Sequence, residues 1–594
     1  MSATKNQDAP VDSGSKRAGR NIEVRVRIWP AILIVLAHLA ATFGFLRFGS
    51  TSLHSVLGVG VAPALATLLL LLWWLTASRV PWRDRLIGLA LFIAAIPWIV
   101  FTQKSNGEML LMLALPVMTT GIVGLLAMTC WLRWPARRWV LVLFMVGCAG
   151  GFTALRVDSV TGDFTPLVAW RWSPTTEGRA IDLAPSGVQG TALLPAQPGP
   201  GDWPGFRGPE RDSHVTGVKF PTDWTTPPRE LWRRPVGVGW SSFTVIGDYV
   251  FTQEQRGGAG LVTCYRADTG EEIWTNQNEP AFEDSMGSGP RATPTFDNGR
   301  LYTQGATGLL QCLDAATGKT LWQRDLVAEE GAKRPTWGFS SSPLVVGGRV
   351  VAFAGEGEAN GVVAYDCVSG ELAWRAGNST SGYSSPHFAR IEGVAQVLMS
   401  SDFGIQSFVP ETGELLWEHA WKIKNTPRVA QPLITDNNAI LLGTTMIDAS
   451  GGGTRRIQVG KKDSGWNVTE DWTVKKFRPY FNDFVCHKGH CYGFDGNRLA
   501  SIDAATGAPG WQGKRFGGQV LLLTEMDMLL VLSEKGDVIL VRAAPENYEE
   551  LGQFKALTGK TWNHPVIAHG RLFVRNAEEA ACFDLSADVP EKLS

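Results

Sequence analysis

Residues 312–322 read CLDAATGKTLW, a short apolar run followed by a turn at Thr317-Gly318 and a second run that ends at Trp322. Asp and Thr favour tight turns and Gly accepts a positive φ, so this segment predicts a β-hairpin corner. Because the corner recurs along the chain, it indicates a repeat architecture. Four related segments, each with glycine four residues before tryptophan, occupy residues 264–274, 364–374, 407–417 and 501–511.

The spacing of the corners sets the size of the repeating unit. The turn glycines lie 42 to 52 residues apart by subtraction of their positions, which leaves room for four short strands in each unit. That length is typical of a propeller blade and is too long for a leucine-rich repeat. These glycines are Gly270, Gly318, Gly370, Gly413, Gly465 and Gly507.

The two ends of the repeat region predict how a ring closes. Eight units fit after residue 229, but the eighth runs out after Cys582-Phe583-Asp584, before a fourth strand. Residues 230–235, ELWRRP, have a strand pattern upstream of the first unit. If they supply the missing strand, two open sheet edges disappear. We therefore predict an all-β, eight-bladed propeller over residues 229–594, with four-stranded blades and terminal strand closure.

The first third of the chain is rich in apolar residues. Five apolar runs are each close to the roughly 20 residues that cross the hydrocarbon core of a membrane. They predict a transmembrane domain of five helices over residues 27–156. The runs occupy residues 28–46, 56–76, 86–101, 109–132 and 140–155.

Basic residues in the short loops predict the orientation of these helices. Cytoplasmic loops carry the excess of Lys and Arg, which makes residues 1–26 a cytoplasmic tail and places everything after residue 155 in the periplasm. Residues 157–228 are predicted to form a periplasmic linker, whose lead-in DWPGFRGP at 202–209 packs on the propeller. The basic residues are Lys16, Arg17, Arg20, Arg25, Arg27, Arg79, Arg83, Arg85, Arg133, Arg137 and Arg138.

The repeated corner resembles the tryptophan docking motif of quinoprotein dehydrogenases and of the wider pyrroloquinoline-quinone (PQQ)-like propeller repeat family. That family also contains a non-enzymatic outer-membrane assembly lipoprotein, so the motif identifies the fold rather than the chemistry. The resemblance implies that the tryptophans dock neighbouring blades. The residues that it assigns to docking are Gly270, Trp274, Gly318, Trp322, Gly370, Trp374, Gly413, Trp417, Gly507 and Trp511.

The layout of five helices before an exported propeller is similar to that of the membrane-bound, quinone-reducing glucose dehydrogenase. The lead-in and the segment GPRATP at residues 289–294 look more like the membrane-anchored PQQ-like propeller proteins of planctomycetes and acidobacteria. For those proteins the family implies no established activity.

The strand order predicts which face of the propeller carries a site. If the Thr-Gly turns join third and fourth strands, the loops between blades lie on the opposite face. Side chains expected on that face are Glu283, Asp284, Arg291, Trp337, Glu356, Glu358, Asp402, Tyr480, Asn482, Asp483, Asp495 and Asp537.

The resemblance also implies a chemistry for that face. In quinoprotein dehydrogenases a calcium ion held by oxygen ligands polarises PQQ, a carboxylate acts as base and a tryptophan stacks on the ring. Asn482 with Asp483 is the candidate ligand pair, and Asp483 is the candidate base. A full Glu, Asn, Asp set does not align, so no metal site is assigned. Candidates for contact with the cofactor are Arg291, Trp337, Asn482, Asp483, Trp562, Asn563 and His564.

A structural interpretation of the same positions is also open. Polar side chains at the starts of inner strands could cap those strands and line a solvated central channel, and four of the candidates fit this: Asn482, Asp483, Asn563 and His564. Arg291 could bind an anionic ligand or form an ion pair with Glu283 or Asp284.

The segment CHKGHC at residues 486–491 resembles a metal site at first sight. If Lys488-Gly489 is a two-residue hairpin turn, Cys486 faces Cys491 while the histidines face each other on the other side. One metal ion cannot then bind all four side chains. A disulfide, which suits an exported domain, and free packed thiols both remain compatible with the spacing.

These features favour a binding or scaffolding protein of the cell envelope, anchored in the cytoplasmic (inner) membrane, with a protein, peptide or envelope component as partner. The formal net charge of −1 gives no sign of nucleic-acid binding. The alternative is a PQQ-dependent, calcium-containing membrane dehydrogenase that oxidises an alcohol or sugar and reduces quinone. Intact blades without a recognisable catalytic set favour the binding protein.

Overall fold

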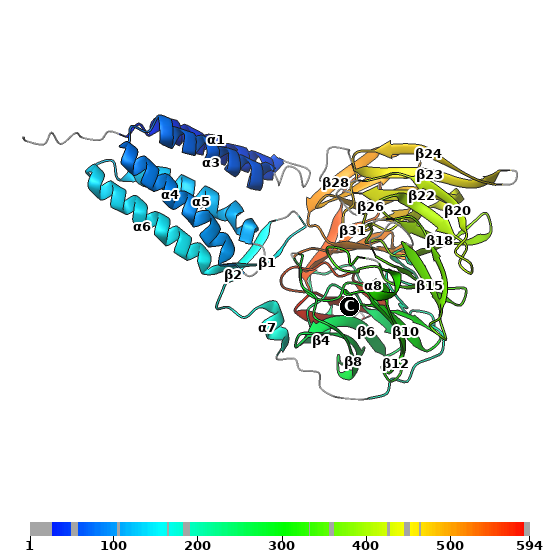
Figure 1. The fold of residues 1–594 in the computed structure, drawn as a ribbon. Coiled ribbons are helices and arrows are strands. Elements are labelled where there is room, and N and C mark those ends of the chain that lie inside the picture. The colour runs from blue at the N-terminus through cyan, green and yellow to red at the C-terminus, as the bar shows by residue number, and fades with distance from the viewer. Residues whose placement is uncertain are drawn as a thin grey trace, which may run out of the picture.

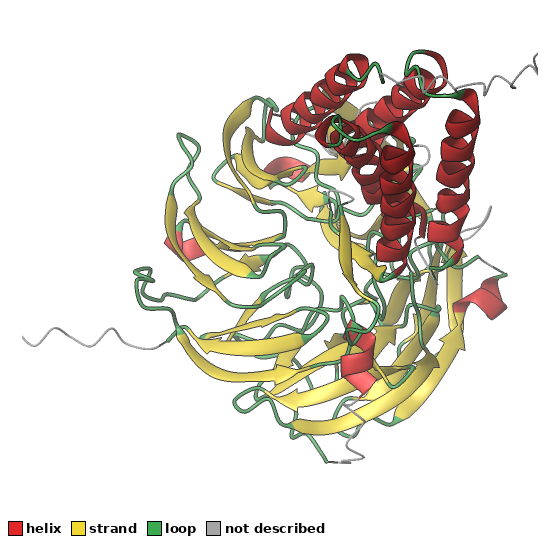
Figure 2. Ribbon diagram, turned by 90° about the vertical axis from the view of Figure 1, so that its left-hand side faces the viewer, coloured by secondary structure: helices red, strands yellow, loops and turns green. Residues whose placement is uncertain are grey.

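The computed structural model places a bundle of helices beside a ring of β-sheets (Figure 1). Seen along the ring axis, the sheets radiate from the centre and the helices project from one face (Figure 2). The structure describes residues 26–48, 57–103, 107–162, 165–181, 190–284, 286–331, 333–355, 361–379, 381–423, 428–444, 452–462 and 465–586.

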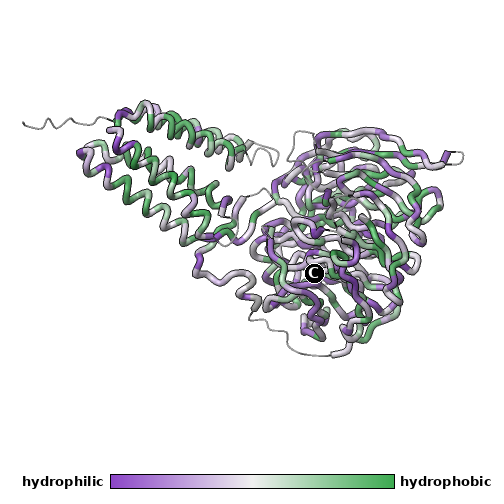
Figure 3. The backbone as a smooth tube through the Cα atoms, in the orientation of Figure 1, coloured by the Kyte–Doolittle hydropathy of each residue, from purple (hydrophilic) through white to green (hydrophobic). Residues whose placement is uncertain are grey.

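Each of the five predicted apolar runs forms a helix. They are α1 (Trp29–Phe48), η1 (Leu57–Val61) continued by α3 (Ala62–Thr76), α4 (Trp82–Phe101), α5 (Gly107–Met128) and α6 (Trp134–Thr153). Among the described residues, four helices are long and apolar enough to cross a membrane, and the apolar part of α1 is shorter. Their hydrophobic residues extend around the helices instead of forming one stripe (Figure 3), which is typical of membrane spans.

Eight blades of four strands form the ring, as predicted, and the sheet of blade 7 gains a fifth strand from outside the repeat. Blade 1 contains β5 (Thr244–Ile246), β6 (Tyr249–Arg256), β7 (Ala259–Arg266) and β8 (Glu272–Pro280). Blade 2 contains β9 (Thr295–Asp297), β10 (Arg300–Gln304), β11 (Leu309–Asp314) and β12 (Thr320–Asp325). Blade 3 contains β13 (Leu344–Val346), β14 (Arg349–Phe353), β15 (Val362–Asp366) and β16 (Leu372–Ala376). Blade 4 contains β17 (His387–Ile391), β18 (Val394–Ser400), β19 (Gly404–Phe408) and β20 (Leu415–Ala420).

The second half of the ring repeats this order. Blade 5 contains β21 (Leu433–Ile434), β22 (Ala439–Thr444), β23 (Gly453–Lys462) and β24 (Gly465–Val474). Blade 6 contains β25 (Val485–His487), β26 (His490–Asp495), β27 (Arg498–Asp503) and β28 (Pro509–Arg515). Blade 7 contains β29 (Gln519–Leu523), β30 (Met528–Leu532), β31 (Asp537–Arg542) and β32 (Glu550–Lys555). Blade 8 contains β33 (Val566–Ala568), β34 (Arg571–Arg575), β35 (Glu579–Asp584) and β4 (Arg229–Pro235).

Blade 8 closes the ring in the predicted way. Its outer strand, β4, comes from before blade 1 and pairs antiparallel with β35. Arg575 of β34 then reaches into blade 1, where its guanidinium donates to the carbonyls of Gln253 and Gly237. The ring is therefore closed by a sheet that contains strands from both ends of the propeller and by the buried Arg575 side chain.

Tryptophans join neighbouring blades at the Thr-Gly corners. The Trp232 ring of blade 8 covers Gly270 of blade 1, where an added Cβ would lie 2.8 Å from the indole. The Trp232 indole N–H donates to the carbonyl of Ala267, 2.9 Å away. The same bond to the next blade is made by Trp274, Trp322, Trp374, Trp472 and Trp511.

Blade 5 departs from the repeat. Gly465, expected as its corner, is the first residue of the long strand β24, and no atom outside its chain neighbours lies within 4 Å of an added Cβ there. Trp417 of blade 4, without a corner to cover, donates instead to the Gln396 side chain of its own blade. Trp472 nevertheless covers Gly507 of blade 6.

The chain between helices and propeller forms a two-stranded hairpin, β1 (Leu155–Val160) with β2 (Pro166–Trp170). Its base is held against the helix ends, because Arg171 N–H donates to the carbonyl of Ala154. Its far end reaches the propeller, where the N–H of Gly162 donates to Glu534 Oε1 at 2.7 Å. The hairpin thus ties the helices to one face of the ring.

The lead-in at residues 202–209 and the residues that follow it up to 215 lie inside the ring. Trp203 exchanges both backbone hydrogen bonds with Val245 of blade 1, and the short strand β3 (His214–Val215) runs parallel to β29 of blade 7. Between them, Arg211 donates to the carbonyls of Ser342 and Pro343 in blade 3. We call residues 202–215 the plug, because this segment fills the channel that the structural interpretation expected to be solvated.

Candidate binding site

A cavity of about 160 Å³ lies on the ring axis above the plug. All eight blades contribute to its wall, six of them through residues two apart at the start of the inner strand. Side chains alternate between the two sides of an extended chain, so residues two apart point to the same side. Both members of each pair therefore face the axis, and together the pairs form an outer and an inner layer. The six pairs are Trp240 and Ser242, Arg291 and Thr293, Tyr383 and Ser385, Val429 and Gln431, Phe481 and Asp483, and Trp562 and His564.

Aromatic rings dominate the outer layer. Trp240 and Trp562 of blades 1 and 8 have ring centroids 5.3 Å apart, and Phe481 lies 4.7 Å from Trp562. Trp337 and Tyr383 of blades 3 and 4 form a second pair at 5.3 Å. Because blades 8 and 4 are opposite in an eight-membered ring, the two groups face each other across the axis.

The inner layer is a hydrogen-bonded belt that joins six consecutive blades. In each step a backbone N–H of one blade donates to a side-chain oxygen of the next blade, at 2.6 to 3.1 Å. Buried polar groups need such partners, so the belt satisfies the inner ends of the blades. Its members in order are Ser242, Thr293, Ser342, Ser385, Gln431 and Asp483.

Asp483, the candidate base, is the last acceptor of this belt. Its Oδ1 accepts the N–H of Gln431 at 2.6 Å, and its Oδ2 lies 3.6 Å from the Arg207 guanidinium of the plug. Burial raises the pKa of the Asp483 carboxyl, against the opposing effects of Arg207 and the Gln431 N–H. Arg207 is itself held by Ser213 and by the carbonyl of Phe484.

The buried histidines beside the plug are neutral. Burial, reinforced by the charge of Arg207, lowers the pKa of His564 to about 3. Burial together with Arg207 and Arg211 lowers the pKa of His387 to about 3 as well. His564 also packs edge-on against Phe206 of the plug, with ring centroids 4.9 Å apart.

Arg291 forms the predicted type of ion pair rather than presenting a free charge. Its guanidinium lies 2.6 Å from Asp284, and both side chains are 9% exposed. It also donates to the carbonyls of Gly289 and Gly287. The positive charge at this edge of the cavity is therefore compensated.

Trp562 stands between a carboxylate and an ammonium group. Its indole N–H donates to Glu534 Oε1, which also accepts the hairpin N–H of Gly162. Lys560 Nζ lies 3.5 Å from the Trp562 centroid and 4.7 Å from that of Trp240. Burial lowers the pKa of Lys560 to about 7. These contacts hold the Trp562 ring in the wall of the cavity.

The oxygen atoms available near Asp483 do not match a calcium-bound PQQ. Asn482 accepts the N–H of Tyr480 and donates to the carbonyl of Gly518, and Asn563 donates to the carbonyl of Ser241. Calcium takes six to eight oxygen ligands, whereas the groups beside Asp483 Oδ2 are the Arg207 guanidinium at 3.6 Å and His564 Nε2 at 3.7 Å. Within the ranges that the structure describes, no three His, Cys, Asp or Glu side chains converge as metal ligands. Glu356 and Glu358 lie outside the described residues.

Of the other side chains expected on this face, Tyr480 lines the cavity, whereas Asp495 and Asp537 lie elsewhere. Asp495 pairs with Arg478 at 2.7 Å, and Asp537 accepts from Ser533 in its own turn. Sequence reasoning missed Trp240 and the plug aromatic Phe206. A signal for Trp240 was present, because an aromatic or apolar residue stands two positions before four of the six belt residues: Trp240, Tyr383, Val429 and Phe481.

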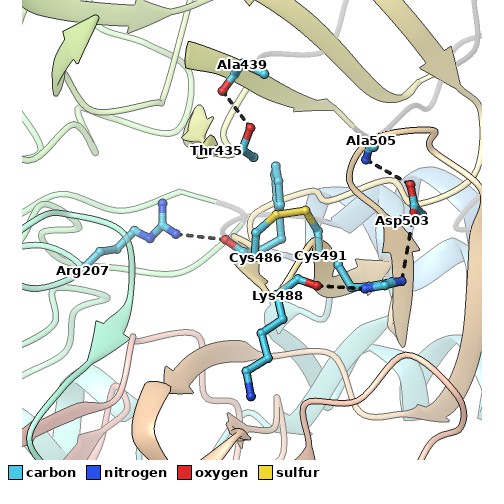
Figure 4. Close-up of a disulfide and its surroundings, with 10 residues drawn as sticks. Arg207, Thr435, Ala439, Cys486, Lys488, Cys491, Asp503 and Ala505 are labelled. Carbon is cyan, nitrogen blue, oxygen red and sulfur yellow. Dashed lines mark hydrogen bonds and ion pairs between the residues drawn. A yellow bond between two sulfur atoms is a disulfide. The ribbon is translucent and has the colours of Figure 1, made fainter. Parts of the chain in front are cut away.

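The cysteine hairpin carries a disulfide in this structure (Figure 4). Cys486 pairs with Cys491 and His487 with His490 in the register of β25 and β26, around a turn in which Lys488 and Gly489 have positive φ. The histidines lie apart from the sulfur atoms, and His487 contacts Asp527. The segment is a cross-linked turn.

Known proteins match parts of the ring. A family model described as outer membrane protein assembly factor BamB matches residues 258–470. The quinoprotein alcohol dehydrogenase PedH of Pseudomonas putida is 32% identical over 141 residues, which span 22% of this chain and 22% of that protein.

Two solved structures of low identity are similar to part of this chain. BamB from Moraxella catarrhalis is 14% identical, with a TM-score of 0.44 over 61% of this chain and 98% of that one. The quinohemoprotein alcohol dehydrogenase from Comamonas testosteroni is 15% identical, with a TM-score of 0.46 over 66% of this chain and 82% of that one. Residues 258–470, which the family model matches, lie within the eight-bladed ring, so this part of the chain is similar to that family.

Proposed function

We propose that this protein is a binding or scaffolding protein of the cell envelope, anchored in the cytoplasmic membrane with its propeller in the periplasm. The observation that carries the proposal is the place of Asp483 in the belt. Other blades fill that place with Ser, Thr or Gln, and the Asp483 carboxylate serves Gln431 and Arg207. Asp483, the candidate catalytic base, thus joins neighbouring blades to each other and to the plug.

The arrangement of basic residues supports the orientation. Arg27 N–H donates to the carbonyl of Ser78, and Trp134 donates to Asp84, so the starts of α1, α4 and α6 meet at one end of the bundle. That end holds the Arg-rich loops, whereas the hairpin β1–β2 leaves from the other. By the positive-inside rule the Arg-rich end is cytoplasmic and the propeller periplasmic. The Cys486–Cys491 disulfide suits the same compartment.

The position of the hairpin β1–β2 favours an axial cavity that faces the membrane. Trp170 and Trp172 stack at its base with centroids 5.0 Å apart, and tryptophans favour the membrane–water interface. From there a strand of six residues spans about 20 Å at the usual rise, and Thr161 and Gly162 beyond it line the axial cavity. We infer that a partner reaches the cavity through the space between propeller and bilayer.

The alternative, a PQQ-dependent dehydrogenase, is favoured by the short match to a quinoprotein alcohol dehydrogenase. Reconstitution of the detergent-solubilised full chain with PQQ and calcium separates the two. The proposal expects no stoichiometric PQQ after gel filtration and no dye reduction with alcohols or sugars. One PQQ per chain together with substrate-dependent dye reduction contradicts it.

A further inference from the structure

The surface that the axial cavity offers to a ligand is mostly aromatic carbon. The polar atoms of the inner layer are largely engaged within the protein: Ser385 Oγ accepts the N–H of Ser342, and Gln431 Oε1 accepts from Ser384 and Ser385. Gln519 Nε2 donates to the carbonyl of Trp562. Among the described residues of the lining, Trp240 Nε1, Gln519 Oε1 and His564 Nδ1 have no hydrogen-bond partner. A ligand rich in hydroxyl groups would therefore find only these scattered polar atoms, whereas an apolar ring finds stacking surfaces.

The charges that line the cavity are compensated. Arg291 is paired with Asp284 and Asp483 with Arg207, and the pKa of His564 is lowered to about 3, mainly by burial. A charged group entering the cavity would lose water without gaining a free counter-charge. The occupant is therefore uncharged.

The cavity volume limits the occupant to about one ring. Its 160 Å³ is similar to the engineered apolar cavity of about 150 Å³ that accepts benzene. Opposed aromatic pairs, Trp337 with Tyr383 and Trp240 with Trp562, stand on the two sides of this space. Phenylalanine and tyrosine side chains match both the size and the stacking geometry.

A second cavity of about 210 Å³ lies beside the first and shares the Trp240 wall. It runs beneath the hairpin, where Ser159 lines it, and its far side includes Thr558 and Asn576. The charged residues Asp158, Lys560 and Glu578 line it as well. This polar lining suits a polypeptide backbone, whose N–H and C=O groups need hydrogen-bond partners.

We propose that the axial cavity anchors a protein partner through one uncharged aromatic side chain, with the adjoining main chain in the cavity beneath the hairpin. The proposal rests on the binding function proposed above and names the chemistry of its partner. Buried aromatic anchors in a pocket are the usual source of binding energy at such interfaces.

The test is saturation-transfer NMR on the detergent-solubilised full chain, with N-acetyl-tyrosinamide and N-acetyl-phenylalaninamide as probes. Both ring amides are expected to bind more tightly than N-acetyl-leucinamide, N-acetyl-lysinamide and the ring-only compound p-cresol. Trp337→Ala is expected to weaken ring-amide binding about tenfold, while Trp337→Phe, which keeps a ring in the wall, retains most of it.

The matched control is Trp466→Ala, in the outer strand β24 of blade 5 and away from the axis, which is expected to leave binding unchanged. Equal binding of the leucine and tyrosine amides, or unchanged binding in Trp337→Ala, would overturn the aromatic anchor. Equal binding of p-cresol and the tyrosine amide would overturn the role given to the main chain. Failure here leaves the PQQ test unaffected, whereas stoichiometric PQQ binding contradicts the proposed function itself.

Discussion

Asp483 and Arg207 are the residues on which the interpretation of the site depends. Their side chains are 6% and 1% exposed and come from blade 6 and the plug. When one partner of a buried ion pair is removed, the other is left as an uncompensated buried charge, which costs about 3 to 5 kcal/mol. Removal of a residue kept only for function is instead often neutral or stabilising.

We therefore expect Asp483→Asn to lower the thermal unfolding midpoint of the propeller, followed by circular dichroism. The loss corresponds to about 3 kcal/mol, and the double variant Asp483→Asn with Arg207→Met should recover most of it. Glu549→Gln is the control, because its pair with Arg542 is exposed on both sides and exposed ion pairs add little to stability. A midpoint for Asp483→Asn equal to that of the control would refute the structural role.

The buried histidines predict a pH dependence. His387 and His564 have folded-state pKa values near 3, below the value of about 6.5 in an unfolded chain. The unfolded state therefore binds more protons below pH 6.5, and stability falls as the pH drops from about 6.5 toward 3. Asp483 acts in the opposite sense, because its pKa is raised.

Between pH 7 and pH 5 each histidine is expected to cost about 2 kcal/mol of stability. Unfolding midpoints measured across this range should fall for the natural chain and change much less for a variant with His387→Gln and His564→Gln. Parallel profiles for the two proteins would show that the histidines are already charged in the fold.

At the scale of elements, the corners were readable from sequence because each depends on local turn chemistry. Trp472 was harder to assign, because its own blade has no glycine four residues before the tryptophan, and this spacing marked the other docking tryptophans. The belt was harder still, because Ser, Thr, Gln and Asp serve there interchangeably as acceptors. The plug was predicted only to pack on the propeller, since nothing local shows that residues 202–215 enter the ring.

Gly270 provides a test of docking at the closure between blades 8 and 1. Its φ is +71° and an added Cβ would lie 2.8 Å from Trp232, whereas Gly299 has the same φ with open space around it. Gly299→Ala therefore reports the backbone strain alone, expected at about 1 to 2 kcal/mol. Gly270→Ala should cost clearly more, because the Trp232 ring must also move.

The measurement for both variants is the thermal unfolding midpoint of the full chain. Equal losses for Gly270→Ala and Gly299→Ala would mean that contact with the tryptophan contributes little to blade docking.

In the proposed arrangement of the whole molecule, the helices lie in the membrane and the propeller face with the axial cavity points toward it. Alkaline phosphatase, which is active only after export, can be fused after residue 155 or after Arg79. We expect activity from the first fusion and none from the second, since Arg79 lies in a predicted cytoplasmic loop. The reverse pattern would place the propeller in the cytoplasm.

The central claim is that the plug and the belt occupy the axis that a calcium-bound quinone would need. Electron cryo-microscopy of the full chain, incubated with PQQ and calcium, tests it most directly. The account predicts the Arg207 guanidinium beside Asp483 and no tricyclic density between Trp337 and Trp562. Planar density there, with a calcium ion bound to Asp483 and Arg207 displaced, would contradict it.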